Sequence, residues 1–286
     1  MRQQVPAPLA AYAEALAAAA GTAASGWHHT AGHNVAAALD AAVCTPELPY
    51  HDRHHAAETT LAMGWLCAAA RAERQLSGHE AALGVIAMLG HDLAHDGSPP
   101  LGGILERRAA QRVAAATAHL ALSDRDAAII RTIILHTDPA LVPLTAARVA
   151  GDMAPGPHGP SVDLLCGLAN EADILPSILP TLGWTLAEHL AAEWRNTGYA
   201  ARAASVVGFR GRLSFLRLYP RFTRAATIMG VARLHAIQMA AFTSLDFGPE
   251  DGGPLTDAEA AARALDAMPA AAAHRRYADA LAFAAG

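Results

Sequence analysis

The chain has 286 residues, of which 53% are hydrophobic and 16% are charged, and its formal net charge is −5. This composition excludes a largely disordered chain, and the dispersed arginines with no lysine give no electrostatic footprint for nucleic acid. No apolar run reaches the length of about 18 residues that a transmembrane helix needs, so we expect no membrane partner. The three cysteines, Cys44, Cys67 and Cys166, form no CxxC pair, which argues against disulfides and thiolate zinc and favours the reducing cytoplasm.

The pattern of apolar residues predicts an all-α protein, a compact bundle of many helices, because no run alternates with the period of a strand. We expect one domain over residues 1–286, in which an N-terminal helix and a C-terminal helical pair add to a core at about 50–220. The segment 151–160 is rich in glycine and proline, and we interpret it as a connection rather than a lid. The expected helices span 7–21, 51–75, 79–95, 103–121, 123–136, 161–175, 181–197, 200–218, 222–245, 256–268 and 270–284.

The stretch 90–97, Gly-His-Asp-Leu-Ala-His-Asp-Gly, concentrates metal-seeking side chains at the end of an expected apolar helix. On that helix His91 and His95 share a face, and Asp92 lies about 100° around it. Buried histidine and aspartate need partners, and neutral imidazole with carboxylate suits zinc, iron, manganese or nickel. This stretch therefore predicts a metal site.

Other polar residues recur inside apolar segments. His51 and His55 are four residues apart near the start of an expected helix and face the same way, although taken alone they fit two solvated histidines better. Asp173 lies in an apolar helix that has no structural use for a carboxylate unless a cation or a donor meets it. Glu106 and Asp138 complete one constellation with these residues.

These residues resemble the HD-type metal-dependent phosphohydrolases and, within them, the class I cyclic nucleotide phosphodiesterases. Tyr50-His51-x3-His55-Ala56 is similar to the family's Tyr-His-Asn-x-x-His-Ala, and His91-Asp92-x-x-His95 matches its His-Asp-x-x-His. The resemblance covers about residues 50–220. The further matching positions are Leu105-Glu106, Thr137-Asp138, Ala172-Asp173, Trp184-Thr185, Glu193, Gly198 and Ser205-Val206-Val207-Gly208-Phe209.

The resemblance implies a hydrolase that cleaves a cyclic nucleotide, cyclic AMP or cyclic GMP, or another small phosphodiester at two divalent metal ions. The first ion would be zinc or iron and the second magnesium or manganese, with His51 as the general acid. The implied first-metal ligands are His55, His91, Asp92 and Asp173, with Asp92 bridging the two ions. The residues implied to hold waters of the second ion or the substrate phosphate are His95, Glu106, Thr137 and Asp138. The implied substrate pocket consists of Tyr50, Trp184, Glu188, Val206 and Phe209.

Three departures from the family pattern concern substrate recognition. Val206 replaces the glutamine that hydrogen-bonds a purine, Pro176 replaces an asparagine, and Glu188 replaces an apolar residue of the base clamp. Because no amide is left to read the purine edge, we expect discrimination between cyclic AMP and cyclic GMP of about tenfold or less. Glu188 would also disfavour a second phosphate, so singly charged diesters should be cleaved better than cyclic dinucleotides.

Other functions remain open from sequence. An HD-fold di-iron oxygenase would need further histidine ligands, which His54 or His136 would supply. A phosphomonoesterase or nucleotidase of the HD superfamily is a variation on the main hypothesis, and a regulatory helical domain with a relic site is the non-enzyme alternative. The sequence predicts a small-molecule partner and leaves a homodimer open.

Overall fold

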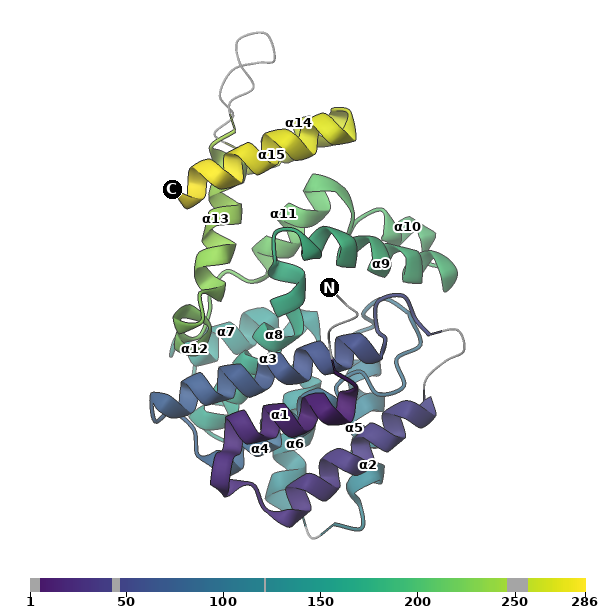
Figure 1. Cartoon of the computed structure of the whole chain (residues 1–286), viewed down its shortest axis with the longest axis vertical. Coiled ribbons are helices and arrows are strands. Elements are labelled where there is room, and N and C mark those ends of the chain that lie inside the picture. Colours follow the sequence, from purple (N-terminus) through teal and green to yellow (C-terminus); the bar gives the residue numbers. More distant parts are fainter. Residues whose placement is uncertain (1–5, 43–46, 121, 246–256) are drawn as a thin grey trace. The chain divides into compact units, whose positions relative to one another are not determined.

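The computed structural model describes residues 6–42, 47–120, 122–245 and 257–286 (Figure 1). It confirms the all-α prediction, because these residues form helices and no strand. Cys67 and Cys166 are buried free thiols, and Cys44 lies outside the described residues. Within the described part of the chain, no single helix is long and apolar enough to cross a membrane, although the bent pair 124–135 and 139–149 passes on length and composition.

The chain divides into two compact units, a division that falls within the span of 1–286 that the sequence analysis assigned to one domain. Unit 1 comprises Met1–Pro176 and Arg221–Met229, and unit 2 comprises Ser177–Pro220 and Gly230–Gly286. The helices of unit 1 are α1 (Pro8–Ala20), α2 (Gly26–Ala42), α3 (Arg53–Ala72), α4 (Gly78–Leu89), α5 (Ile104–Thr117), α6 (Asp124–Leu135), α7 (Val142–Val149), α8 (Pro160–Ile178, whose last two residues belong to unit 2) and α12 (Arg224–Ile228), with the 3-10 helices η2 (Gly21–Ala23) and η3 (Pro139–Leu141). Those of unit 2 are α9 (Leu182–Asn196), α10 (Ala200–Ala203), α11 (Gly208–Leu218), α13 (Val231–Thr243), α14 (Ala258–Ala267) and α15 (Ala270–Ala285).

Two predicted helix ends were wrong at the metal-seeking residues. The helix predicted at 51–75 begins at Arg53, because the Asp52 side chain caps it by accepting a hydrogen bond from the His55 amide. The helix predicted at 79–95 ends at Leu89, so residues 91–94 form turns rather than a helical face. The prediction that His91 and His95 share a helix face is therefore corrected.

Two helices of unit 1 were missed by the sequence analysis. Helix α2 buries one stripe of apolar residues, Ala31, Val35, Ala36 and Leu39. In the sequence this stripe is obscured by the polar residues between its members, such as His33 and Asn34. Helix α7 contains Pro143 in its first turn, where a proline is tolerated because its missing N–H would have no helical partner. The predicted helix 200–218 forms two helices, the second of which begins at Gly208, and the predicted helix 222–245 is divided at Gly230. Both glycines have a positive φ. The prediction that residues 151–159 are irregular is confirmed.

The layer that supports the site consists of α1, α3 and α4, which pack against one another in unit 1 (Figure 1). Helix α4 is buried almost throughout, and the capping box of Ser77 and Glu80 fixes its start. Glycines allow close approach: a Cβ on Gly64 would lie 2.6 Å from the Ala15 Cα atom of α1. A Cβ on Gly84 of α4 would meet Met63 of α3 and Leu165 of α8, so α8 also packs closely here.

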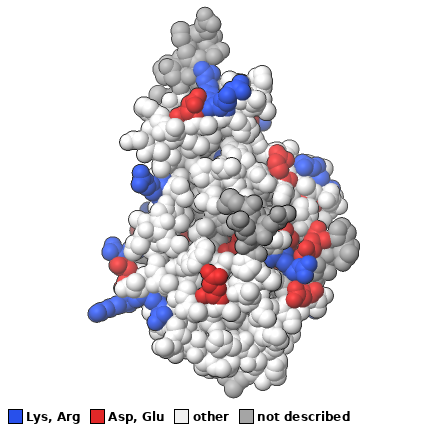
Figure 2. Space-filling model, in the orientation of Figure 1, with Lys and Arg blue, Asp and Glu red and all other residues white. Residues whose placement is uncertain are grey.

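Unit 2 contains an aromatic cluster, in which Trp184 and Phe209 pack against Tyr277 at centroid distances of 5.9 and 5.5 Å, and a buried guanidinium. Arg212 of α11 donates hydrogen bonds to the backbone oxygens of Ser177 and Ile178 and to the Gln238 side chain. These acceptors satisfy a group that is only 4% exposed. On the face drawn in Figure 2, charged side chains are few and the two signs are interspersed.

The contact at Gly64 gives a stability prediction. Because an added methyl group would meet the α1 backbone, Gly64→Ala should lower the free energy of unfolding by about 1–3 kcal/mol. The matched control is Gly26→Ala, where the added Cβ meets nothing within 4 Å and the change should stay within about 0.5 kcal/mol. Urea unfolding followed by circular dichroism measures both, and equal effects of the two substitutions would contradict the close packing of α1 on α3.

Candidate metal centre

Four ligand atoms from three parts of unit 1 converge. The His55 Nε2 atom lies 3.2 Å from Asp92 Oδ2 and 3.1 Å from Asp173 Oδ1. The His91 Nε2 atom lies 3.0 Å from the same Asp92 oxygen and 3.4 Å from the same Asp173 oxygen. Both imidazoles are 2% exposed, and His55, His91 and Asp173 form one group of side chains that could hold a metal ion.

Each of these side chains is positioned by its own backbone context. His55 follows the Asp52 cap and therefore lies in the first turn of α3. The His91 Nδ1 atom lies 2.8 Å from the Met88 backbone oxygen, a contact that requires a proton on Nδ1. Asp173 lies on α8, whose Leu165 side chain lies close to Gly84 of α4. The helices thus bring ligands that are distant in sequence to one point.

The hydrogen bonding of the two imidazoles fits a cation. Because the His91 Nδ1 atom donates to Met88, its Nε2 atom in the neutral ring presents a lone pair to the two carboxylates. Among the described residues, the buried Nε2 atoms of His55 and His91 make no hydrogen bond of good geometry, although carboxylate oxygens lie within 3.4 Å. Ligand atoms that crowd around a point without bonding to one another are the arrangement that a metal ion requires.

Electrostatics in the metal-free protein lead to the same conclusion. Burial alone would lower the pKa of His55, but the adjacent carboxylates of Asp173 and Asp92 outweigh it and raise that pKa to about 9. At His91, burial also lowers the pKa, but the charge of Asp92 outweighs burial and raises this pKa well above its usual value. The two imidazoles in turn hold the pKa values of Asp92 and Asp173 well below the usual range, against the effect of burial. Positive charge is therefore strongly favoured at this point.

A second group of side chains that could hold a metal ion consists of His51, Asp92 and His95, and its Asp92 Oδ2 atom also lies 3.2 Å from His55 Nε2 and 3.0 Å from His91 Nε2 of the first group. The His51 and His95 rings are stacked, with centroids 3.7 Å apart, and His51 Nε2 lies 4.0 Å from Asp92 Oδ2. The His95 Nδ1 atom accepts a hydrogen bond from the Gly97 amide at 3.0 Å. Neutral His95 therefore carries its proton on Nε2, which suits a donor to an oxygen better than a metal ligand.

The turn that carries His95 is held in a constrained shape. Ala94 has a φ of +66°, a left-handed conformation that is uncommon for a residue other than glycine. Asp96 accepts hydrogen bonds from the Ser98 side chain and from Arg108 of α5, both at 2.6 Å. The turn is thereby tied to the helix that also carries Glu106.

Besides His95, the residues predicted to hold metal-bound waters lie at the start of α5 and after α6. Glu106 is buried, and burial together with the charges of Asp138 and Asp92 raises its pKa. Its Oε2 atom has no hydrogen-bond partner among the described residues. Asp138 caps η3 through the Ala140 amide, and the Thr137 hydroxyl donates to the Ile134 backbone oxygen. Glu106 is thus the member of this set with an unsatisfied buried oxygen near Asp92.

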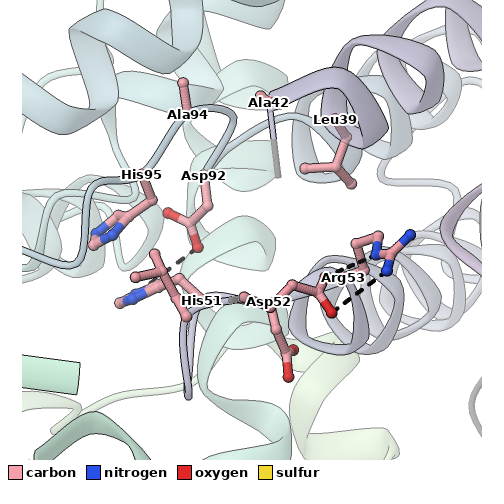
Figure 3. Close-up of a pocket in the computed structure, with 10 residues that line it drawn as sticks. Leu39, Ala42, His51, Asp52, Arg53, Asp92, Ala94 and His95 are labelled. Carbon is pink, nitrogen blue, oxygen red and sulfur yellow. Dashed lines mark hydrogen bonds and ion pairs between the residues drawn. The ribbon is translucent and has the colours of Figure 1, made fainter. Parts of the chain in front are cut away.

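A pocket opens beside the second group (Figure 3). Its wall includes residues that the sequence analysis did not single out, because their helix, α2, and their segment before α3 were not recognised as part of a site. The lining residues are Leu39, Ala42, Glu47, Leu48, His51, Asp52, Arg53, Asp92, Ala94 and His95.

The residues predicted to form a substrate pocket are distributed over both units. The Tyr50 ring lies beside those of His51 and His55 in unit 1, at centroid distances of 4.8 and 4.9 Å. In unit 2, the Trp184 and Phe209 rings pack together at 4.9 Å, and Phe209 is 3% exposed.

The other two predicted pocket residues of unit 2 differ in exposure. Glu188 is exposed on α9, whereas Val206 is half-buried and packs against a core cluster that includes Trp194. Phe209 is further fixed in unit 2 because its amide donates to Asp266.

Neither histidine proposed as an additional iron ligand joins the two groups found in the described part of the chain. The His54 side chain is 43% exposed, and its Nδ1 atom lies 3.9 Å from Asp52. The His136 Nδ1 atom lies 2.8 Å from the Thr145 hydroxyl, and burial with the charge of Arg148 lowers the pKa of His136.

Comparison with known proteins adds no identification: no family model matches the chain, and no curated protein matches it.

The pKa of His55 predicts a pH dependence of metal binding. A raised pKa means that the proton on His55 stabilises the metal-free protein fully below about pH 6.5, and that this stabilisation is lost as the pH rises through about 9. A cation must displace this proton, so zinc or manganese affinity should rise from pH 6.5 to 9. Competition with a chelator measures the affinity at each pH. The control is His79→Gln, which alters the separate His79–Asp126 pair and should keep the same pH dependence of metal affinity. An affinity that stays constant or falls over this range would contradict the assignment.

Proposed function

We propose that this chain is a two-metal phosphodiesterase that hydrolyses small phosphodiesters. The observation that carries the proposal is the position of Asp92, which belongs to the group of His51 and His95. Its Oδ2 atom also lies within 3.2 Å of the Nε2 atoms of His55 and His91 and 4.0 Å from that of His51. Shared carboxylates are suited to bridging two cations. The resemblance of the His-Asp-x-x-His motif to HD-type phosphohydrolases supports the same chemistry.

The residues fit a zinc or iron ion at the first group, held by His55, His91, Asp92 and Asp173, and a magnesium or manganese ion beside it. When bound, two such ions lower the pKa of a water and neutralise the phosphate charge. Glu106, with its free buried oxygen and raised pKa, would accept hydrogen bonds from waters on the second ion. His95 would donate its Nε2 proton to a phosphate oxygen.

His51 is proposed as the general acid. Its ring borders the pocket and is oriented by the stacked ring of His95, while its Nε2 atom remains 4.0 Å from Asp92. In the reaction an oxygen of water forms a bond to phosphorus, the bond to the ester oxygen breaks, and His51 gives that oxygen its proton. Protonation matters most when the leaving group is a poor one.

The donor set supports hydrolysis better than the oxygenase alternative, since His54 and His136 have other surroundings and lie outside both groups. A phosphomonoesterase would use the same centre, and kcat/KM values for a phosphomonoester and a phosphodiester distinguish the two activities.

The central role of Asp92 predicts a coupled loss. Asp92→Ala should remove metal and lower phosphodiesterase activity to background, because one carboxylate serves both groups. Elemental analysis and hydrolysis of bis(p-nitrophenyl) phosphate measure the two effects. The control Asp126→Ala, which breaks a separate ion pair with His79, should retain both metal and activity. Retention of near-full activity by Asp92→Ala would overturn the proposal, and circular dichroism separates metal loss from unfolding.

The role of His51 predicts a dependence on the leaving group. His51→Ala should lower kcat about 10²–10⁴-fold with an alkyl leaving group and far less with nitrophenol, which departs without protonation. Its metal content should not change. His54→Ala is the matched control, because that side chain is an exposed neighbour, and it should lower neither rate. Loss of metal from His51→Ala would instead show that His51 is a ligand.

A further inference from the structure

The pocket beside the candidate centre combines two kinds of surface. Leu39, Ala42 and Leu48 form an apolar part, and in Figure 3 Leu39 and Arg53 lie on the side of Asp92 opposite to His95. In that view His95 and Asp92 lie at one end of the pocket, and Leu39 and Arg53 lie at the other. A substrate phosphate at the first end would direct one of its ester arms toward the second.

The charges at the second end are predominantly negative. The pocket is lined there by the carboxylates of Glu47 and Asp52 and by one guanidinium, that of Arg53. The Arg53 Nε atom lies 2.7 Å from Glu47 Oε1, and its NH1 atom lies 3.6 Å from Asp40 Oδ1. The hydrogen bond from Arg53 also lowers the pKa of Glu47, so this carboxylate is ionised at neutral pH.

Arg53 is therefore not available as a free anion-binding group. Its charge is shared by Glu47 and Asp40, and Asp52 adds a further negative charge at the same wall. Residues 43–46, which lie between α2 and this wall in the sequence, are uncharged in sequence and do not change the balance. An apolar surface next to excess carboxylate is complementary to an organic cation.

We propose that this pocket selects phosphodiesters in which one ester arm is a short alkyl chain ending in an ammonium group. This inference rests on the proposed phosphodiesterase function and specifies its substrate class. The methylene and methyl groups of such an arm would contact Leu39, Ala42 and Leu48, and its positive charge would face Glu47 and Asp52. Glu47 is the residue that determines the preference, because it lines the pocket and also neutralises Arg53.

The test compares two substrates of equal shape. In p-nitrophenyl phosphocholine the arm ends in a trimethylammonium group, and in p-nitrophenyl 3,3-dimethylbutyl phosphate a carbon replaces the nitrogen. Release of nitrophenol from both gives kcat/KM values for the metal-loaded protein. We expect the cationic substrate to be preferred about tenfold or more, and the preference to shrink as salt is added, because the charges at the rim are partly exposed.

Two variants assign the preference to the pocket. Glu47→Gln should reduce the ratio of the two kcat/KM values to about threefold or less, since it removes a carboxylate and frees Arg53. Asp40→Asn also removes a partner of Arg53, but Asp40 is 61% exposed and does not line the pocket, so its ratio should stay within about twofold of the original. If Glu47→Gln fails to fold or to bind metal, the ratio of the unaltered protein and its salt dependence decide.

The outcomes separate the two proposals. Hydrolysis of both substrates at equal rates, or a preference for the neutral arm, would overturn the inference about the ammonium group and leave the phosphodiesterase proposal intact. Hydrolysis of neither substrate by the metal-loaded protein would overturn the phosphodiesterase proposal and this inference with it.

Discussion

The candidate site of unit 1 depends on two buried imidazoles that meet two partly buried carboxylates at one point. His55 and His91 are almost completely buried, and Asp92 and Asp173 face both of them at 3.0 to 3.4 Å. Without a cation, this arrangement is satisfied only by protons on the histidines, which is why the pKa of His55 is raised to about 9. Burying charged groups in an apolar layer is costly unless they are paired or bind a metal ion.

The surrounding fold makes this burial feasible. Alanine and glycine at the contacts of α1, α3 and α4 let the helix backbones approach closely, so the layer beneath the site contains little polar surface. Polar groups gather instead at helix ends, where Asp52 caps α3 and Asp96 ties the turn after α4 to α5. An apolar layer with polar groups at its helix ends thus brings together potential metal ligands from distant parts of the sequence.

The all-α fold class and the identity of the converging residues could be predicted from the sequence. The periodic apolar runs of α1, α4 and α8 indicated helices, and a carboxylate at Asp173 inside such a run had no structural explanation. The spacing rule for His91 and His95 gave the wrong local structure, because the helix stops at Leu89 and tertiary contacts rather than helical periodicity place these side chains. The pocket wall from α2 was missed because Glu47 and Arg53 acquire a role only when α2 packs nearby, which no local pattern records.

The most direct test of the central claim is a crystal structure of the zinc-loaded protein with anomalous diffraction data collected at the zinc absorption edge. The account predicts an anomalous peak coordinated by the Nε2 atoms of His55 and His91 and by oxygens of Asp92 and Asp173, at zinc–ligand distances of about 2.0–2.2 Å. The account would be contradicted if the zinc-loaded protein showed anomalous peaks only at other side chains while His55, His91, Asp92 and Asp173 still contacted one another.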